Sequence, residues 1–195
     1  MVAVHVGLCS MTIALSGNEA QKEKYLPKLA SGEFLGAYSL SEAGSGTDAA
    51  AMVAKATDDG DCYTLNGEKM WVTNGTTADL FVLFAKVTDH PDYGKKSHGG
   101  VTCFIIEKGF EGFQIGKKED KLGIRSSDTC TLILNNCKVP KENVLGEVGK
   151  GFPIAMNALD NSRIGIAAQG LGIAQGAYET ALKYSKERET FGKPI

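Results

Sequence analysis

A tryptophan and a threonine two residues apart are the side chains best suited to hold a planar ligand. In the strand expected over 69–74, side chains alternate between faces, so Lys69, Trp71 and Thr73 point to one face. Trp71 is the only tryptophan in the sequence. Its ring, beside the Thr73 hydroxyl, could wall a planar cofactor and hydrogen-bond its edge, whereas a half-buried core tryptophan is the plainer alternative.

A short segment with two glycines could meet a phosphate. Residues 43–48 read Ala-Gly-Ser-Gly-Thr-Asp and follow a β-like run. The glycines would let backbone N–H groups approach an anion. A plain turn is the alternative, because the segment lacks the lysine of a P-loop and the third glycine and βαβ context of a dinucleotide fold.

Two arginines lie on an apolar helical stripe. From Gly151 to about Thr190 a spacing of three and four residues aligns apolar side chains, and Arg163 and Arg188 fall among them. A guanidinium there must find an anion or acceptor, because its desolvation is costly. For Arg163 a structural salt bridge to Asp160 is the alternative to a ligand. For Arg188 the alternative is a cation that complements the helix dipole.

Composition and charge narrow the classes of partner. The 195 residues are 43% hydrophobic and 23% charged, which is enough to bury a core. The 21 basic and 23 acidic residues are interspersed and give a net charge of −2. No extended field of one sign results, so we expect no nucleic-acid partner.

Cysteine and histidine usage indicates a reduced, metal-free chain. Five cysteines, an odd number, form no Cys-x-x-Cys motif, so we expect free thiols and an intracellular protein. The three histidines lie far apart without the spacing of metal ligands, so we expect no metal site.

The first 31 residues are expected to be helical. Gly17 ends one helix, and Asn18 with Gln21 resembles a capping box that opens a second, which Pro27 interrupts. The apolar run up to Leu15 is short for a membrane span, so we expect none. It looks instead like a helix cut from a larger bundle, which suggests a fragment.

The rest of the chain predicts an α+β fold. From Phe34 to Val139 short β-rich runs alternate with turns, which favours an antiparallel β-sandwich or barrel. Residues 89–100 are the most loop-like stretch. The helix from Gly151 would span roughly 50–60 Å, too long to bury itself on a small sandwich. The predicted fold is thus an antiparallel β-sandwich or barrel flanked by an N-terminal helical remnant and one long C-terminal helix.

Taken in order, five segments resemble the acyl-CoA dehydrogenase family. They read Tyr-Ser-Leu-Ser-Glu-Ala-Gly-Ser-Gly-Thr-Asp from Tyr38, Trp-Val-Thr-Asn from Trp71, Gly-Lys-Lys-Glu-Asp-Lys-Leu-Gly-Ile-Arg from Gly116, Leu-Asp-Asn-Ser-Arg-Ile-Gly from Leu159 and Arg-Glu-Thr-Phe-Gly from Arg188. The resemblance covers the whole chain and is closest to short-chain, butyryl-CoA-like members. It implies the end of an N-terminal helical domain over 1–33, a middle β-domain over 34–146 and the first helix of a truncated C-terminal helical domain over 147–195.

The same resemblance implies FAD as cofactor, bound between the β-domain and the C-terminal bundle. By matching position, its ring would contact Tyr38, Ser39, Leu40, Ser41, Trp71, Val72 and Thr73, with Ser41 near the pyrimidine edge and Thr73 near N5. Gly46 and Thr47 would lie at the phosphate and acyl-CoA end.

Further residues are implied at the substrate and at a neighbouring subunit. Asp160, Asn161, Ser162 and Arg163, with Thr47, would line the approach of the acyl-CoA. Arg188, Thr190 and Phe191 would reach FAD held by another subunit of a homotetramer. Electron-transfer flavoprotein is the implied redox partner, and the bacterial cytoplasm or the mitochondrial matrix is the implied compartment.

In the implied reaction a glutamate removes the α-proton of the thioester while the β-hydrogen leaves as hydride to the flavin, giving the trans-2-enoyl-CoA. Isovaleryl and long-chain members place this base immediately before the arginine matching Arg163, where this chain has Ser162. No catalytic base is therefore assigned, and we expect it beyond Ile195. Two alternatives stay open: an acyl-CoA oxidase of the same fold, and a non-catalytic β-domain that binds flavin or CoA.

Overall fold

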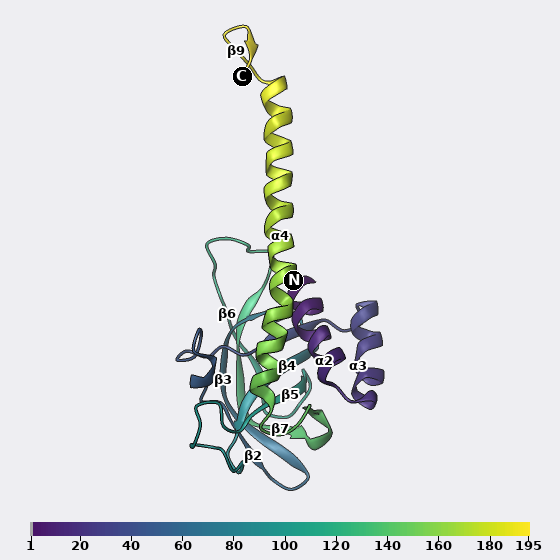
Figure 1. Cartoon of the computed structure of the whole chain (residues 1–195), viewed down its shortest axis with the longest axis vertical. Helices are drawn as coiled ribbons and strands as arrows, with labels where there is room; N and C mark the ends of the chain where they lie inside the picture. The colour runs from purple at the N-terminus through teal and green to yellow at the C-terminus, as the bar shows by residue number, and fades with distance from the viewer. Residues whose placement is uncertain (1) are drawn as a thin grey trace.

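The chain begins as one helix in three parts (Figure 1). In the computed structural model, which describes residues 2–195, these are α1 (Val2–Val4), the π-helical η1 (His5–Ser10) and α2 (Met11–Ser16). The junctions keep α-helical backbone angles, so the parts run on without a break. Gly17 ends the helix, as predicted. Met1, the first residue of the predicted helical remnant, lies outside the described residues.

The second helix, α3 (Glu19–Ser31), confirms the predicted capping box. The Asn18 side chain accepts from the Gln21 N–H at 2.9 Å, and the Gln21 side chain accepts from the Asn18 N–H at 3.1 Å. The expectation that Pro27 interrupts this helix was wrong. Pro27 lies on the exposed side of α3, as does Glu23, so the Glu23 carbonyl that loses its helical donor faces water.

Eight strands form one sheet in the order β6-β7-β3-β2-β4-β5-β8, with β1 beside β4. They are β1 (Gly36–Ser39), β2 (Lys55–Asp58), β3 (Cys62–Thr73), β4 (Leu80–Val87), β5 (Val101–Glu107), β6 (Phe113–Lys118), β7 (Thr129–Pro140) and β8 (Val144–Leu145). The α+β class and the flanking helices are confirmed. The sheet is mixed rather than purely antiparallel, because β1 and β2 both run parallel to β4. Long connections through other strands make these parallel pairings possible.

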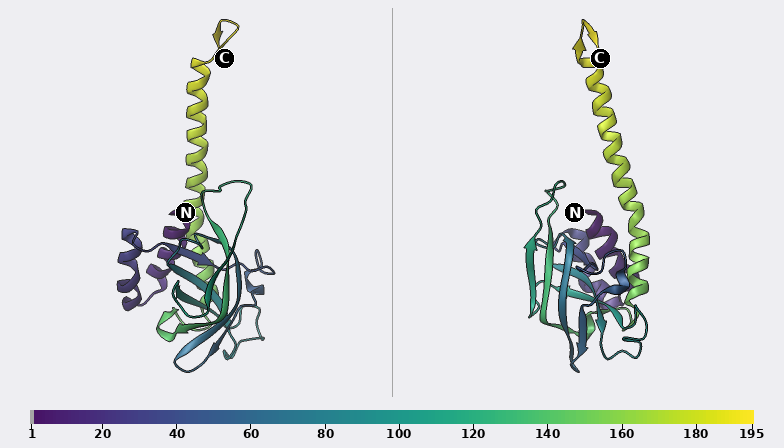
Figure 2. Two further views of the ribbon diagram at one scale, coloured as in Figure 1. Left: turned by 180° about the vertical axis from the view of Figure 1, so that it is seen from behind. Right: turned by 90° about the vertical axis from the view of Figure 1, so that its left-hand side faces the viewer.

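Strand β4 lies at the centre of the fold because both of its faces are buried. Phe81 and Leu83 point into a core formed on one face of the sheet, where they pack with Phe104. Val82 and Phe84 point the other way, into a second core that the sheet shares with the helices. Figure 2 shows the N-terminal helices and the start of α4 on the same face of the sheet.

The long helix α4 (Gly151–Glu187) starts on the sheet and leaves it (Figure 1). Gly151, Ala155 and Ala158 are its buried residues, and nearly every residue after Ser162 is exposed. A Cβ on Gly151 would lie 2.6 Å from the Thr102 carbonyl carbon, so the close approach to β5 requires glycine. None of the helices among residues 2–195 is long and apolar enough to cross a membrane.

Short elements complete the chain. The 3-10 turns η2 (Ala49–Ala51) and η3 (Lys141–Asn143) lie in connections, and β9 (Glu189–Thr190) pairs with β10 (Lys193–Pro194) beyond the end of α4.

Gly67, where β3 changes register against β7, allows a close backbone contact that positions the connection after β1. Its φ is +146°, and an added Cβ would lie 2.8 Å from Ala54 Cβ. We expect Gly67→Ala to lower the free energy of unfolding by about 2 kcal/mol through backbone strain and overpacking. Gly165→Ala is the matched control, because a Cβ there meets nothing within 4 Å. Urea unfolding followed by circular dichroism tests this, and equal midpoints for the two variants would contradict it.

Candidate functional site

A β-bulge in β3 determines which side chains reach the site. From Lys69 to Val72 the strand advances three residues, while its partner β7 advances two, from Leu132 to Cys130. Trp71, inside the bulge, has a φ of +59°. As a result Trp71 is 59% exposed while Lys69 is fully buried. The expectation that Lys69 shares a face with Trp71 and Thr73 was therefore wrong.

Trp71 and Thr73 do meet at one pocket, of about 170 Å³, at the junction of four segments. Its lining comes from the first helix, the end of β1, the bulge of β3 and α4: Val4, Leu8, Tyr38, Leu40, Ser41, Met70, Trp71, Thr73 and Leu159. Complete small-molecule sites measure roughly 300–1,000 Å³, so this pocket can hold one edge of a larger ligand.

Side chains alternate between the two faces of β1, so only some of the residues predicted around Tyr38 face the pocket. The Tyr38 hydroxyl donates to the Ala155 carbonyl at 3.4 Å, which links the pocket wall to α4. Ser39 points to the opposite side, is fully buried, and its hydroxyl finds no hydrogen-bond partner among residues 2–195. Val72 is likewise buried, in the core that contains Phe81 and Leu83. Ser39 and Val72 could therefore meet a ligand only through their backbone.

The glycine-containing segment forms a tight turn beside the pocket. Glu42 and Ser45 exchange backbone hydrogen bonds of 2.9 and 3.1 Å, and the Ser45 hydroxyl donates to the Asp48 carbonyl at 2.8 Å. Gly46 and Thr47 follow this turn directly and are exposed. An added Cβ on Gly46 would meet no atom within 4 Å, so the space beside this residue is open.

The residues predicted at the substrate lie along α4. Asn161 and Ser162 line a groove of about 410 Å³ between the first helix and α4, together with Val6 and Gly7. Asp160 and Arg163 are not buried, and no ion pair joins them in the part of the chain that the structure describes. The structural salt bridge considered for Arg163 is therefore absent there.

The third group of predicted residues lies far from the pocket. Arg188, Thr190 and Phe191 are exposed, and Phe191 is 98% exposed. They lie at the hairpin of β9 and β10, which Figure 1 shows at the far end of α4. A helix of 37 residues is about 55 Å long. These residues thus cannot contact the same ligand edge as Trp71 within one chain.

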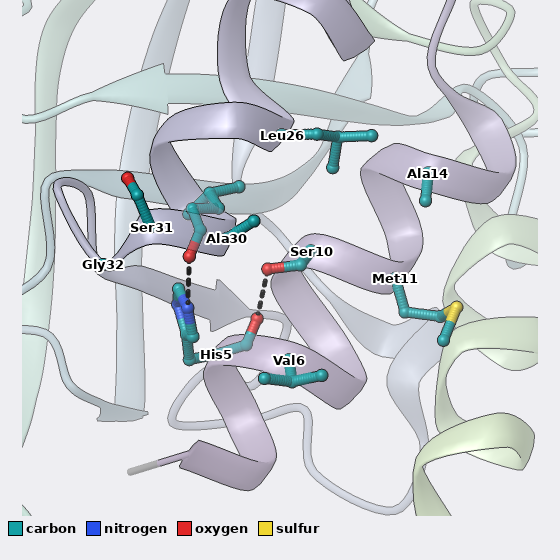
Figure 3. Close-up of a pocket in the computed structure, with 10 residues that line it drawn as sticks. His5, Val6, Ser10, Met11, Ala14, Leu26, Ala30, Ser31 and Gly32 are labelled. Atoms are coloured by element: carbon teal, nitrogen blue, oxygen red, sulfur yellow. Dashed lines mark hydrogen bonds between the residues drawn. The ribbon is translucent and has the colours of Figure 1, made fainter.

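A larger pocket of about 500 Å³ lies between the first helix and α3 (Figure 3). Its only imidazole is fully engaged: His5 Nδ1 accepts from the Gly36 N–H at 2.9 Å, and Nε2 lies 3.0 Å from the Leu29 carbonyl. The remaining lining, including Val6, Met11 and Leu26, is mostly apolar. This pocket offers no group for acid–base or redox chemistry.

Sequence reasoning missed two clusters of charged residues. Lys69 is fully buried and donates to Glu42 Oε1 at 2.7 Å directly behind the pocket. Burial lowers the pKa of Lys69, and the Glu42 carboxylate opposes that shift. The available signal was a lysine, Lys69, two residues before Trp71. The bulge that buries Lys69 has no sequence signature.

The second cluster lines a pocket of about 430 Å³ beside the 89–100 loop. Lys55, Lys86, Lys95 and Lys96 lie around it, and Lys86 also donates to the Ala50 carbonyl at 2.9 Å. Lysines from two strands and one loop meet only in the folded chain. The one signal in the sequence was the pair Lys95 and Lys96 inside the loop-like stretch 89–100.

Metal and thiol chemistry find no support among residues 2–195. No three His, Cys, Asp or Glu side chains there lie together so as to hold a metal ion. All five cysteines are free. Burial raises the pKa of Cys9 to about 12 and that of Cys137 to about 11, which leaves both as unreactive thiols at neutral pH.

Family models for acyl-CoA dehydrogenases match the chain in three consecutive segments. The N-terminal domain matches residues 1–33, the middle domain 37–137 and the C-terminal domain 149–195. The chain therefore belongs to the acyl-CoA dehydrogenase family, and the resemblance seen in its motifs is confirmed.

Individual relatives agree with this assignment. The short-chain specific acyl-CoA dehydrogenase of Clostridium acetobutylicum is 51% identical over 195 residues, all of this chain and 50% of that protein. Butyryl-CoA dehydrogenase of Megasphaera elsdenii superposes with a TM-score of 0.93 at 50% identity over 99% of this chain and 49% of that one. The chain thus spans about half the length of the relatives it matches.

Two further structures bear on ligands and partners. A structure described as the electron transferring flavoprotein of Acidaminococcus fermentans matches with a TM-score of 0.94 at 50% identity, over 100% of this chain and 50% of that one. An acyl-CoA dehydrogenase of Bacillus anthracis complexed with FAD matches with a TM-score of 0.91 at 44% identity, over 99% of this chain and 32% of that one.

Proposed function

We propose that this chain is the flavin-binding part of an acyl-CoA dehydrogenase that converts a short-chain acyl-CoA thioester to the trans-2-enoyl-CoA. The observation that carries the proposal is the pocket where Trp71 and Thr73 meet the end of β1, in a chain 51% identical to a short-chain specific relative. Its domains are proposed to be 1–33, 34–146 and 147–195.

The pocket residues fit one edge of a flavin. Trp71 offers an exposed aromatic face and Thr73 a hydroxyl, and both line the pocket with Ser41. The Ser41 N–H has no acceptor among the described residues, so it is free to donate to a carbonyl at the ring edge. When bound, FAD supplies the acceptor for the hydrogen that leaves the substrate as hydride.

Substrate binding is assigned to residues on either side of this pocket. Asn161 and Ser162 line the groove between α4 and the first helix. The lining of this groove is mostly apolar and suits an acyl chain. Asp160, Arg163 and Thr47 are proposed to line the approach of the thioester. The pocket of four lysines supplies the positive charge that the phosphates of CoA require.

Assembly and partners belong to the same proposal. Arg188, Thr190 and Phe191 are exposed and remote from Trp71, which suits contact with FAD on another subunit of a tetramer. Electron-transfer flavoprotein is the proposed electron acceptor, supported by the Acidaminococcus fermentans match. Free thiols and a bacterial relative support an intracellular location, either the bacterial cytoplasm or the mitochondrial matrix.

The role of Thr73 can be measured directly on this chain. Thr73→Val keeps the side-chain shape and removes the hydroxyl, so we expect the dissociation constant for FAD to rise about fivefold. Quenching of Trp71 fluorescence reports binding, and Thr57→Val on the exposed face of β2 is the matched control. Unchanged affinity and flavin spectrum in Thr73→Val would show that Thr73 does not contact the ring.

The absence of an assigned base gives a second test. Ser162 stands where some family members carry a carboxylate, so we expect this chain with added FAD to leave butyryl-CoA unoxidised. Loss of general-base assistance alone lowers rates by about 10²- to 10⁴-fold. Anaerobic mixing followed at the flavin absorption band measures this, with dithionite as the positive control for reduction. Rapid bleaching by butyryl-CoA would place a base within these 195 residues.

A further inference from the structure

A fully buried lysine and a nearly buried glutamate lie immediately behind the Trp71 pocket. Lys69 and Glu42 have side-chain exposures of 0% and 4%, and their Nζ and Oε1 atoms are 2.7 Å apart. Lys69 Nζ also donates to the Leu40 carbonyl at 3.1 Å. Glu42 accepts from the backbone N–H groups of Val53 at 2.6 Å and Ala54 at 3.2 Å.

The pair thereby joins three segments: the end of β1, the end of the following connection at Val53 and Ala54, and the bulge of β3. Leu40, whose carbonyl accepts from Lys69, and the next residue, Ser41, both line the pocket. Met70 donates its N–H to the Ser41 carbonyl at 2.9 Å. Both carbonyls are thus fixed toward β3.

This arrangement sets the direction of one donor. The peptide bond between Leu40 and Ser41 is planar and trans, so its N–H points opposite to its C=O. With the Leu40 carbonyl held by Lys69, the Ser41 N–H is directed away from that ammonium group. The ammonium also polarises the peptide, which strengthens the N–H as a donor.

We propose that Lys69 and Glu42 form a positioning pair for the flavin site: Lys69 holds the Leu40–Ser41 peptide so that the Ser41 N–H points into the pocket. Glu42 keeps the ammonium charged and in place. This inference rests on the proposed function, because only a flavin bound in the pocket gives the direction of the Ser41 N–H a role. Apolar side chains could fill the same volume without a buried charge, so packing alone does not require this pair.

A neutral double variant separates positioning from stability. Removing one partner alone leaves an uncompensated buried charge and can unfold the chain. Lys69→Met combined with Glu42→Gln removes both charges, and the amide introduced by Glu42→Gln retains a carbonyl oxygen for the Val53 and Ala54 N–H groups. We expect near wild-type thermal unfolding but about tenfold weaker FAD binding, because the Ser41 donor is no longer fixed.

Lys138→Met is the matched control, since Lys138 pairs with Asp59 at 2.9 Å on the surface, with exposures of 45% and 38%. It should leave FAD affinity unchanged. A double variant that binds FAD as tightly as wild type, with the same flavin spectrum, overturns the proposal.

A second readout does not need FAD. Amide hydrogen exchange over residues 38–54, measured by mass spectrometry, should be about tenfold faster in the double variant and unchanged in Lys138→Met. If wild type binds no FAD, the proposed function fails and exchange alone decides whether the pair orders this segment. Equal exchange in wild type and double variant overturns the positioning role in that case.

Discussion

The extra residue in β3 is the constraint on which the candidate site depends. Because three residues of β3 oppose two of β7, the alternation of side chains reverses between Lys69 and Val72. Lys69 turns into the interior, and Trp71 turns outward with a φ of +59°. The buried ion pair with Glu42 and the exposed tryptophan are thus two results of one backbone distortion, because in a regular strand Lys69 and Trp71 would point to the same face.

The site also depends on how β4 is buried. Phe81 and Phe84 belong to different cores, one among the strands and one beneath the helices. The second core fixes the first helix and the start of α4 on the face where β1 ends. Leu8 and Leu159, distant in sequence, thereby become neighbours of Trp71 in one pocket. The pocket is a junction of segments rather than a feature of any one of them.

Local chemistry made much of this fold predictable. Strand periodicity predicted the middle domain, and the capping box at Asn18 and Gln21 predicted the start of α3. Two features depend on long-range contacts instead: the parallel pairing of β1 with β4 and the gathering of lysines around Lys86. The bulge at Trp71 was missed because the period-two pattern carries no mark of an inserted residue. The motifs indicated which residues belong to the candidate site, and the bulge determines how those residues are arranged.

The central claim is that the pocket beside Trp71 receives the ring of a flavin. Trp71 is the only tryptophan, so its fluorescence reports this pocket alone. The most direct measurement is a titration with riboflavin, which carries the ring without phosphate, against a parallel titration with ADP. The same titrations of N-acetyltryptophanamide give the loss of signal caused by light absorption of each ligand, and this loss is subtracted. Saturable quenching by riboflavin and none by ADP is the predicted result. Quenching by ADP alone, or no saturable quenching by riboflavin, would contradict the assignment of the pocket to the flavin ring.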